Sequence, residues 1–412
     1  MTYYLQKLRV YLFILFIALT LGACGGDSDD TPTFNTEALL GEALFNDTNL
    51  SFNRSQSCST CHDADAAFSD PAKNANDDTR AASVGDDGVS IGDRNTPTAM
   101  YADFIPTFQS GTRARFSSQQ NDYSGWIGGQ FWDGRASDLE EQAGAPLLNP
   151  VEMNMPSRAA VIDRVLENND YIEAFEQLYG GDVFDNTDRA YRLLTEAIAA
   201  FERTDTFSPF SSKYDKSITG EIVFSPASKV AQGKAIFFSQ QFTNCATCHQ
   251  LHVVGNARET FSGYEYHNIG VPKNTELRAE NGKGDAFIDT GLASSDALPS
   301  TENTTLLEGK FRVPSLRNVA VTAPYMHNGV FKSLDTVIRF YDKHLTDSDN
   351  AINPETGVAW AAPEVADNIS TAELQDGRKL TDNEVDALVC FLRSLTDEAY
   401  EALIPDDGLV CE

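Results

Sequence analysis

Two copies of one five-residue pattern constrain this chain more than any other feature of its 412 residues. Each copy reads Cys-x-x-Cys-His, and the residues are Cys58, Cys61 and His62 in the first copy and Cys245, Cys248 and His249 in the second. Two thiols three positions apart can bond both vinyl groups of one haem, and the adjacent histidine can reach its iron from one face. A redox cysteine pair would not need the histidine twice, and no further cysteine pairs complete a zinc site. The chain is therefore expected to carry two covalently attached c-type haems.

The sequence around the two motifs repeats as well. The segment 41–45 (GEALF) precedes the first motif and 233–237 (GKAIF) precedes the second, and both are typical of short amphipathic helices. This repetition predicts a mainly α fold of two homologous, cytochrome c-like haem domains that pack together with long loops. We expect the N-terminal haem domain over 36–207, the C-terminal haem domain over 208–400, and a tail over 401–412.

Hydrophobic periodicity and turn-forming residues predict the other elements. Helices are expected over 158–166, 171–178, 187–201, 228–238, 333–344 and 381–395. Two stretches rich in Gly, Asn and Asp, 70–93 and 277–304, are expected to be loops.

The N-terminus is typical of a targeting segment. Basic residues precede an apolar run from Val10 to Leu21, which is too short for the ~20 residues that span a bilayer. Cys24 directly follows Leu-Gly-Ala, as in the bacterial lipoprotein box. Residues 1–24 are thus predicted to be a lipoprotein-type signal peptide and 25–35 a flexible linker. This predicts a periplasmic protein that contacts the membrane only through a lipid on Cys24; plain cleavage beside an incidental cysteine is the alternative.

Charge and the two remaining cysteines bear on partners and compartment. The formal net charge of −30 argues against a surface for nucleic acid or anionic membrane. It would favour a basic partner, but an acidic surface that keeps an exported protein soluble is the preferred explanation. Cys390 and Cys411 form either a disulfide or two free thiols, and an oxidising compartment favours the disulfide.

A second internal repeat indicates which haem reacts. The segment 132–140 aligns without gaps with 327–335, and fourteen residues beyond the start of each stand Pro146 and Tyr341. A tyrosine can give iron a phenol oxygen, whereas proline has no donor atom. The first haem is therefore expected to keep an open position, as peroxide activation requires, and the second to be closed by Tyr341.

Two polar residues near Pro146 suit peroxide chemistry. Gln142 and Glu152 stand on the same segment as this proline. Cleaving peroxide needs a base that takes a proton from the near oxygen and returns it to the far one, and a buried carboxylate can do this. Glu152 is one of 61 acidic residues, and its place beside Pro146 is what singles it out.

Together these features resemble the bacterial di-haem cytochrome c peroxidase and MauG superfamily. The other segments that carry the resemblance are 92–98 (GDRNTPT), 131–135 (FWDGR), 314–318 (PSLRN) and 322–329 (TAPYMHNG). The resemblance implies that Glu152 and Gln142 form a distal acid–base pair and that Trp132 relays electrons between the haems.

The same resemblance implies a calcium ion between the haems. Its ligands would include Asn95 and the backbone oxygens of Thr322 and Pro324, an oxygen-only set that suits calcium.

Two departures from the typical peroxidase resemble the MauG branch. Typical members have Met where Tyr341 stands, and they have a His in the loop corresponding to 84–92, which contains none here. In the MauG branch the tyrosine-ligated haem shares oxidising equivalents with its open partner, and residues of another protein are oxidised. If Tyr341 is only a core residue, Met326 or His344 is the alternative ligand.

Three functions are compatible with these features. The first is a peroxidase that reduces hydrogen peroxide at the open N-terminal haem, with electrons relayed through the C-terminal haem from a periplasmic cytochrome c or cupredoxin-like donor. The second is a MauG-like enzyme that uses peroxide to oxidise Trp or Tyr residues of a partner protein. The third is a non-enzymatic di-haem electron-transfer cytochrome, against which the open haem argues.

Overall fold

The structure is a computed structural model, and it describes residues 34–71, 80–115, 120–239, 241–251, 258–345 and 347–412. The predicted signal peptide and nearly all of the predicted linker lie outside the described residues. Across the described ranges, no helix is both long enough and apolar enough to cross a membrane.

The core of the N-terminal half is built from α2 (Glu37–Asn46), α4 (Leu139–Leu148), α5 (Arg158–Val165), α6 (Asn169–Tyr179) and α7 (Thr187–Glu202). Each of these helices starts at a Thr, Ser, Asp or Asn whose side chain accepts a hydrogen bond from the first turn. Helix α2 packs against α7 at Gly41, where a Cβ would lie 1.8 Å from the carbonyl oxygen of Ala197. Only glycine permits this close approach of two backbones.

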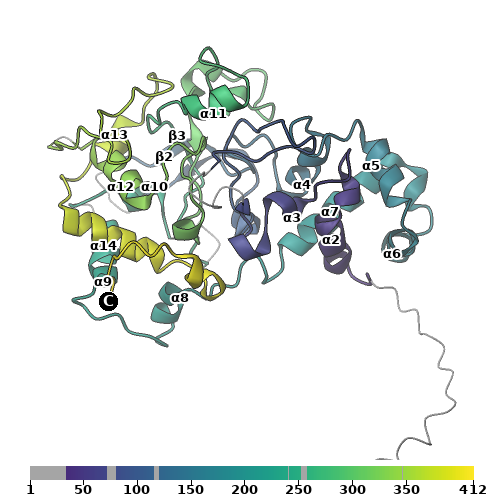
Figure 1. Ribbon diagram of the computed structural model, residues 1–412, viewed down its shortest axis with the longest axis horizontal. Helices are drawn as coiled ribbons and strands as arrows, with labels where there is room; N and C mark the ends of the chain where they lie inside the picture. Colours follow the sequence, from purple (N-terminus) through teal and green to yellow (C-terminus); the bar gives the residue numbers. More distant parts are fainter. Residues whose placement is uncertain (1–33, 72–79, 116–119, 240, 252–257, 346) are drawn as a thin grey trace, which may run out of the picture.

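The C-terminal half repeats this packing. Helix α9 (Lys229–Phe237) lies against α14 (Asp382–Arg393), and a Cβ on Gly233 would lie 1.8 Å from the carbonyl oxygen of Ala387. The glycine that begins each predicted repeat segment is thus the contact point of the main helix pair in each half. Figure 1 shows the two helix groups side by side, with α2 and α7 in one and α9 and α14 in the other.

The remaining elements are short. They are helices α3 (Cys58–Cys61), α8 (Lys213–Ile218), α10 (Cys245–Cys248), α11 (Thr275–Glu280), α12 (Leu334–Asp342) and α13 (Thr371–Leu374), and 3-10 helices at Thr48–Leu50, Ala64–Ala66, Ala102–Phe104, Val183–Asp185, Leu292–Ser294, Thr304–Leu307, Val319–Val321 and Glu398–Leu403. The strands are β1 (Gln109–Arg113), β2 (Tyr123–Ile127), β3 (Tyr266–His267) and β4 (Phe311–Arg312), which form two antiparallel pairs, β1–β2 and β3–β4.

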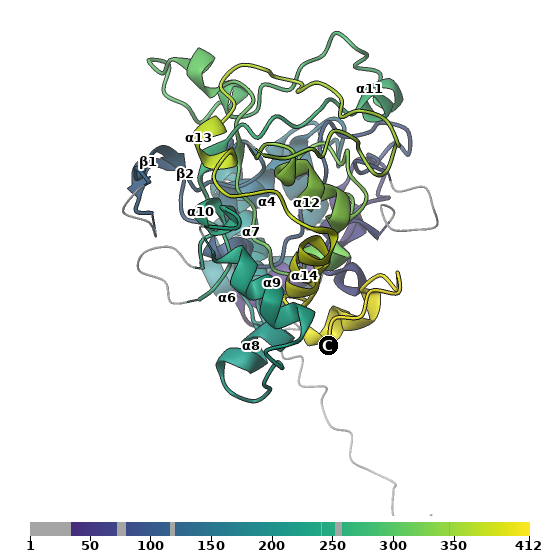
Figure 2. The same ribbon diagram turned by 90° about the vertical axis from the view of Figure 1, so that its left-hand side faces the viewer.

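The two halves interlock. The β1–β2 hairpin, seen at the edge of the molecule in Figure 2, reaches from the N-terminal half to the C-terminal half, where Ile127 forms a bridge with Glu265. In the opposite direction, Asp397 beyond α14 accepts a 2.7 Å hydrogen bond from the hydroxyl of Tyr101. The cavities of the two halves are therefore held in a fixed relation by buried contacts.

The prediction of a mainly α fold is confirmed, and each of the six predicted helices matches an observed one to within two residues at either end. The predicted loop over 277–304 is wrong at its start, because α11 covers Thr275–Glu280. Asn274 caps this helix and Leu277 is fully buried, a short signal among many loop-forming residues. The disulfide prediction is confirmed: Cys390 and Cys411 are bonded. The division into 36–207, 208–400 and a tail stays a prediction.

Candidate functional site

Each Cys-x-x-Cys-His motif opens onto its own cavity. The N-terminal cavity has a volume of about 580 Å³ and is lined by Cys58, Cys61 and His62. The C-terminal cavity has a volume of about 220 Å³ and is lined by Cys245, Cys248 and His249. The four motif cysteines form no disulfide.

The two motif histidines are oriented in the same way. Nδ1 of His62 lies 3.0 Å from the carbonyl oxygen of Phe68, and Nδ1 of His249 lies 3.0 Å from that of Phe261. Because a carbonyl oxygen only accepts, Nδ1 carries the proton and Nε2 carries the lone pair. Burial lowers the pKa of His249 to about 4, so its ring is neutral at pH 7. Thiols for two thioether bonds, an imidazole lone pair and a cavity are thus present twice, and both sets fit a c-type haem.

Part of the wall of the N-terminal cavity comes from α4 and the segment after it. Gln142, Pro146 and Glu152 all line this cavity. Asp138 caps α4, and the backbone N–H of Glu152 donates to the carbonyl oxygen of Asn149 at 3.1 Å. The three residues that the sequence analysis grouped together therefore share one wall.

The environment of Glu152 makes its carboxylate a stronger base than a solvated one. Burial raises the pKa of this carboxyl, while the positive charge of Arg135 and a hydrogen bond from Asn149 act in the opposite direction. The loop 84–92 contributes Val84 and Gly92 to the cavity wall, and His62 is the one histidine among the described residues that line it. The described lining of this cavity therefore offers groups for proton transfer, and it contains no second histidine that could bind iron.

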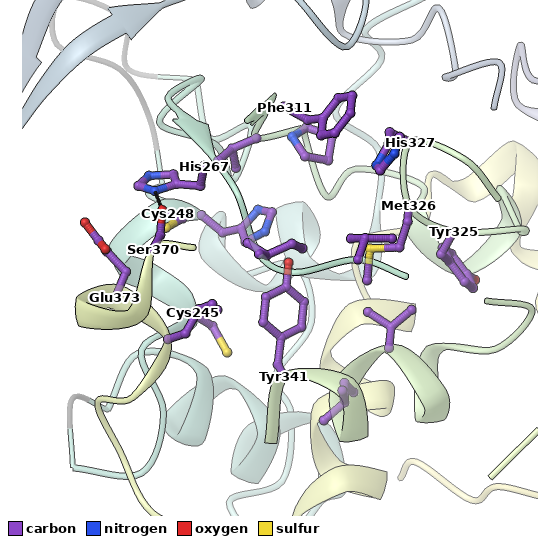
Figure 3. A pocket seen from close by; sticks show the side chains of 18 of the residues that line it. Cys245, Cys248, His267, Phe311, Tyr325, Met326, His327, Tyr341, Ser370 and Glu373 are labelled. Carbon is purple, nitrogen blue, oxygen red and sulfur yellow. Dashed lines mark hydrogen bonds between the residues drawn. The ribbon is translucent and has the colours of Figure 1, made fainter. Parts of the chain in front are cut away.

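The C-terminal cavity is closed by a different set of side chains. Tyr341 comes from α12, and its hydroxyl points into the cavity (Figure 3). Met326 also lines this cavity, whereas His344 is absent from the described lining. Burial raises the pKa of Tyr341, so the phenol stays protonated unless a cation lies beside it. Of the three ligands considered from the sequence, the structure thus brings Tyr341 and Met326 to the cavity.

Trp132 lies between the two cavities, since it lines both of them. Its indole Nε1 donates a 2.8 Å hydrogen bond to the carbonyl oxygen of Asn95, and its own carbonyl oxygen accepts one from the backbone N–H of Arg312. Beside it, Arg94 is held between Asp133 at 2.6 Å and Asp289 at 2.7 Å. These bonds hold the indole ring in place between the two cavities. Trp132 is the one tryptophan among the described residues that line them.

Two of the three residues predicted to bind calcium meet. Nδ2 of Asn95 donates a 3.1 Å hydrogen bond to the carbonyl oxygen of Pro324, and the buried Asn95 also donates to Ala81. A cation between Asn95 and Pro324 would need the amide turned so that its oxygen faces inward. The sequence places Thr322 two residues before Pro324, and the hydroxyl of Thr322 donates to the carbonyl oxygen of Val319 at 3.4 Å.

Two groups of buried polar residues were not predicted from the sequence. Glu202, at the end of α7, lines the N-terminal cavity and is 5% exposed. Glu265 is fully buried, with Arg115 at 2.7 Å and His267 at 3.0 Å, next to Cys248. For Glu202 a signal was available, because it lies four residues after Ile198 on the apolar face of an amphipathic helix.

Comparison with known proteins identifies the family of this chain. The model of the di-haem cytochrome c peroxidase family matches residues 35–222. The methylamine utilization protein MauG of Paracoccus denitrificans (strain Pd 1222) is 47% identical over 392 residues, which cover 95% of this chain and 96% of that protein. The chain belongs to the di-haem cytochrome c peroxidase and MauG family.

Other members agree with this assignment. Cytochrome c551 peroxidase of Pseudomonas aeruginosa is 27% identical over 370 residues, covering 89% of this chain and 80% of that protein. The crystal structure of the diheme peroxidase BthA from Burkholderia thailandensis E264 superposes with a TM-score of 0.74 at 31% identity, covering 91% of this chain and 89% of that one. As a member of this family the chain is an oxidoreductase that uses peroxide, and membership implies two c-type haems.

Proposed function

We propose that the chain reduces hydrogen peroxide in the N-terminal cavity with electrons that arrive through the C-terminal one. The observation that carries this proposal is that Gln142, Pro146 and Glu152 line the same cavity as the first Cys-x-x-Cys-His motif. Proline offers no ligand atom, so peroxide can enter there, and a carboxyl and an amide are within the same cavity to handle it.

The residues of this wall divide the work of proton transfer. Bound haem would supply the electrons that cleave the O–O bond. Glu152 accepts a proton from the near oxygen of peroxide and returns it to the far oxygen, which leaves as water. Gln142, which cannot change its charge, orients the peroxide through its amide. The overall reaction takes up two electrons and two protons for each peroxide and forms two waters.

The second cavity serves electron entry. His249 and Tyr341 would hold its haem, and Trp132 would pass electrons to the N-terminal side. We propose a periplasmic cytochrome c or cupredoxin-like protein as donor, a lipid anchor at Cys24, and a calcium ion held by Asn95, Thr322 and Pro324.

The test is steady-state peroxide reduction by the purified di-haem protein, with a reduced cytochrome c as donor. We expect one peroxide to be consumed for every two donor molecules oxidised, without a preceding reductive activation step. Peroxide consumption that does not depend on the donor would contradict the proposal.

A second function is supported by Tyr341 and by the 47% identity to MauG. In this alternative, the oxidising equivalents from peroxide are passed to Trp or Tyr residues of a partner protein. A phenol oxygen favours ferric iron and would make the C-terminal haem a poor acceptor from a cytochrome. Exposing periplasmic extract to protein and peroxide, followed by mass spectrometry for oxidised Trp or Tyr, separates the two: peroxide-dependent modification of one protein favours the alternative.

A further inference from the structure

The N-terminal cavity contains a second buried carboxyl group that the proposed reaction does not yet use. Glu202 closes α7, lines the same cavity as Glu152, and is 5% exposed. Its Oε2 is buried without a hydrogen-bond partner. An acid buried in this way destabilises the fold, so its presence calls for a functional explanation.

A surface ion-pair cluster lies close to Glu202. The next residue, Arg203, is partly exposed and pairs with Glu140 of α4 at 2.7 Å and with Asp103 at 2.9 Å. Glu140 lies in the first turn of the helix that also carries Gln142 and Pro146. Glu202 thus stands at one point where the cavity wall, α4 and a solvent-facing ion-pair cluster meet.

The charges that act on Glu202 come from these same elements. Arg203 favours its ionised form and Glu140 opposes it, while Cys58 of α3 also lies within electrostatic range. From α2, the neighbouring side chain is the apolar Phe45, which packs against Phe201. Burial outweighs the other effects and raises the pKa of Glu202 to about 8, so the carboxyl holds its proton at neutral pH.

We propose that Glu202 is a proton-relay residue that passes protons from the surface cluster of Arg203, Glu140 and Asp103 into the N-terminal cavity. This inference rests on the proposed function, since reducing one peroxide to two waters consumes two protons inside a buried cavity. Glu152 only moves a proton from one peroxide oxygen to the other and adds none. Glu202 gives its proton to the cavity with each of the two electrons and regains one from the surface each time, so two protons and two electrons are delivered for each peroxide that becomes two waters.

The experiment compares proton uptake in wild type, Glu202→Gln and Glu202→Asp, all as di-haem proteins. The reduced protein is mixed with peroxide in weak buffer with a pH-indicator dye. We expect the Gln variant to take up protons roughly 10²-fold more slowly, the lower end for loss of a proton-transfer group. The Asp variant should recover part of the rate. Glu196→Gln, on the same helix but paired with Arg192 at the surface, serves as control.

A second readout does not depend on turnover. Infrared spectra of the resting protein should show a protonated carboxyl band that disappears with a pKa of about 8 and is missing in the Gln variant. The relay is refuted if this band is absent from wild type, or if proton uptake in the Gln variant equals that of the control. If wild type itself does not reduce peroxide, the proposed function fails, while the infrared titration still reports on Glu202.

Discussion

The two cavities of this molecule are built on similar pairs of helices but are lined by largely different side chains. Each lies beside a helix pair that crosses at a glycine, Gly41 on α2 and Gly233 on α9. Each receives a histidine whose Nδ1 is bonded to a phenylalanine carbonyl at 3.0 Å. The N-terminal cavity, at about 580 Å³, is the larger of the two, while that of the C-terminal half is about 220 Å³.

The difference arises at one position of the repeat. Pro146 stands on the N-terminal wall and Tyr341 on the C-terminal wall. The acids Glu152 and Glu202 line the cavity of Pro146, whereas the cavity of Tyr341 is lined by Met326 and other apolar side chains together with different acids, among them Asp342 and Glu373. One duplicated frame thus carries two different linings, and this difference is the basis for proposing a reacting site in the N-terminal half and an electron-carrying site in the C-terminal half.

The largest effect is expected from removing the proposed proton acceptor of the N-terminal cavity, Glu152. Glu152→Gln keeps the size of the side chain but cannot accept a proton, so the reaction with peroxide should slow by about 10²–10⁴-fold. Stopped-flow mixing with peroxide measures this, and the exposed Glu173→Gln on α6 is the control. A rate equal to that of the control would move the role of base to another group.

The dependence of stability on pH tests the burial of Glu202 in the N-terminal cavity. The pKa of Glu202 rises from its ordinary 4.5 to about 8 on folding, so the folded state binds a proton that the unfolded chain releases. The stabilisation that this proton gives is complete below about pH 4.5 and is lost as pH rises towards 8.

The Glu202→Gln variant has no such proton. As pH rises from about 5 to 8, wild type should therefore lose about 1.4 kcal/mol of its free energy of unfolding per pH unit relative to the variant. Denaturant unfolding at a series of pH values measures this difference. Parallel curves for the two proteins would show that Glu202 is not buried as described.

Exchanging the ligand of the C-terminal cavity should make it resemble an ordinary electron-accepting site. Tyr341→Met replaces a hard oxygen by a thioether that favours ferrous iron, and the potential of this haem should rise by on the order of 100 mV, within the roughly 0.8 V that axial ligands span. Potentiometry measures the change. Tyr341→Phe, which keeps the ring and removes the oxygen, distinguishes ligation from packing; identical potentials in all three proteins would mean that Tyr341 only packs.

The smallest effect is expected at the wall between the cavities. Trp132→Phe loses the 2.8 Å hydrogen bond to Asn95 and should reduce stability by about 1 kcal/mol. It should also slow electron exchange between the haems while leaving both haems attached. Trp126→Phe is a matched control, because Trp126 stacks on Phe108 and lines neither cavity among the described residues. Equal electron-exchange rates in the two variants would remove Trp132 from the pathway.

Local patterns allowed much of this to be predicted from the sequence. The periodicity of residues 187–201 located α7, and the spacing from the second repeat grouped Pro146 with Gln142 and Glu152. Such features depend on neighbours in the chain, which a single sequence contains.

Other features depend on residues that meet only in the folded chain. Glu265 is buried because Arg115, from a hairpin 150 residues earlier, reaches it, and no local pattern indicates this pairing. Helix α11 was missed because its apolar contact is the single buried Leu277 within a stretch of turn-forming residues. Glu202 was missed because an acid at the end of a helix is ordinarily solvated, although its place four residues after Ile198 on the apolar face of α7 indicated burial.

The central claim is that the N-terminal haem has an open position while the C-terminal haem is closed by Tyr341. Electron paramagnetic resonance of the fully oxidised protein tests it most directly. The account predicts one high-spin ferric signal from the N-terminal haem and one low-spin signal from the C-terminal haem, with the high-spin signal lost at once on adding peroxide. Two low-spin signals, in a protein that ignores peroxide until an electron is added, would contradict it.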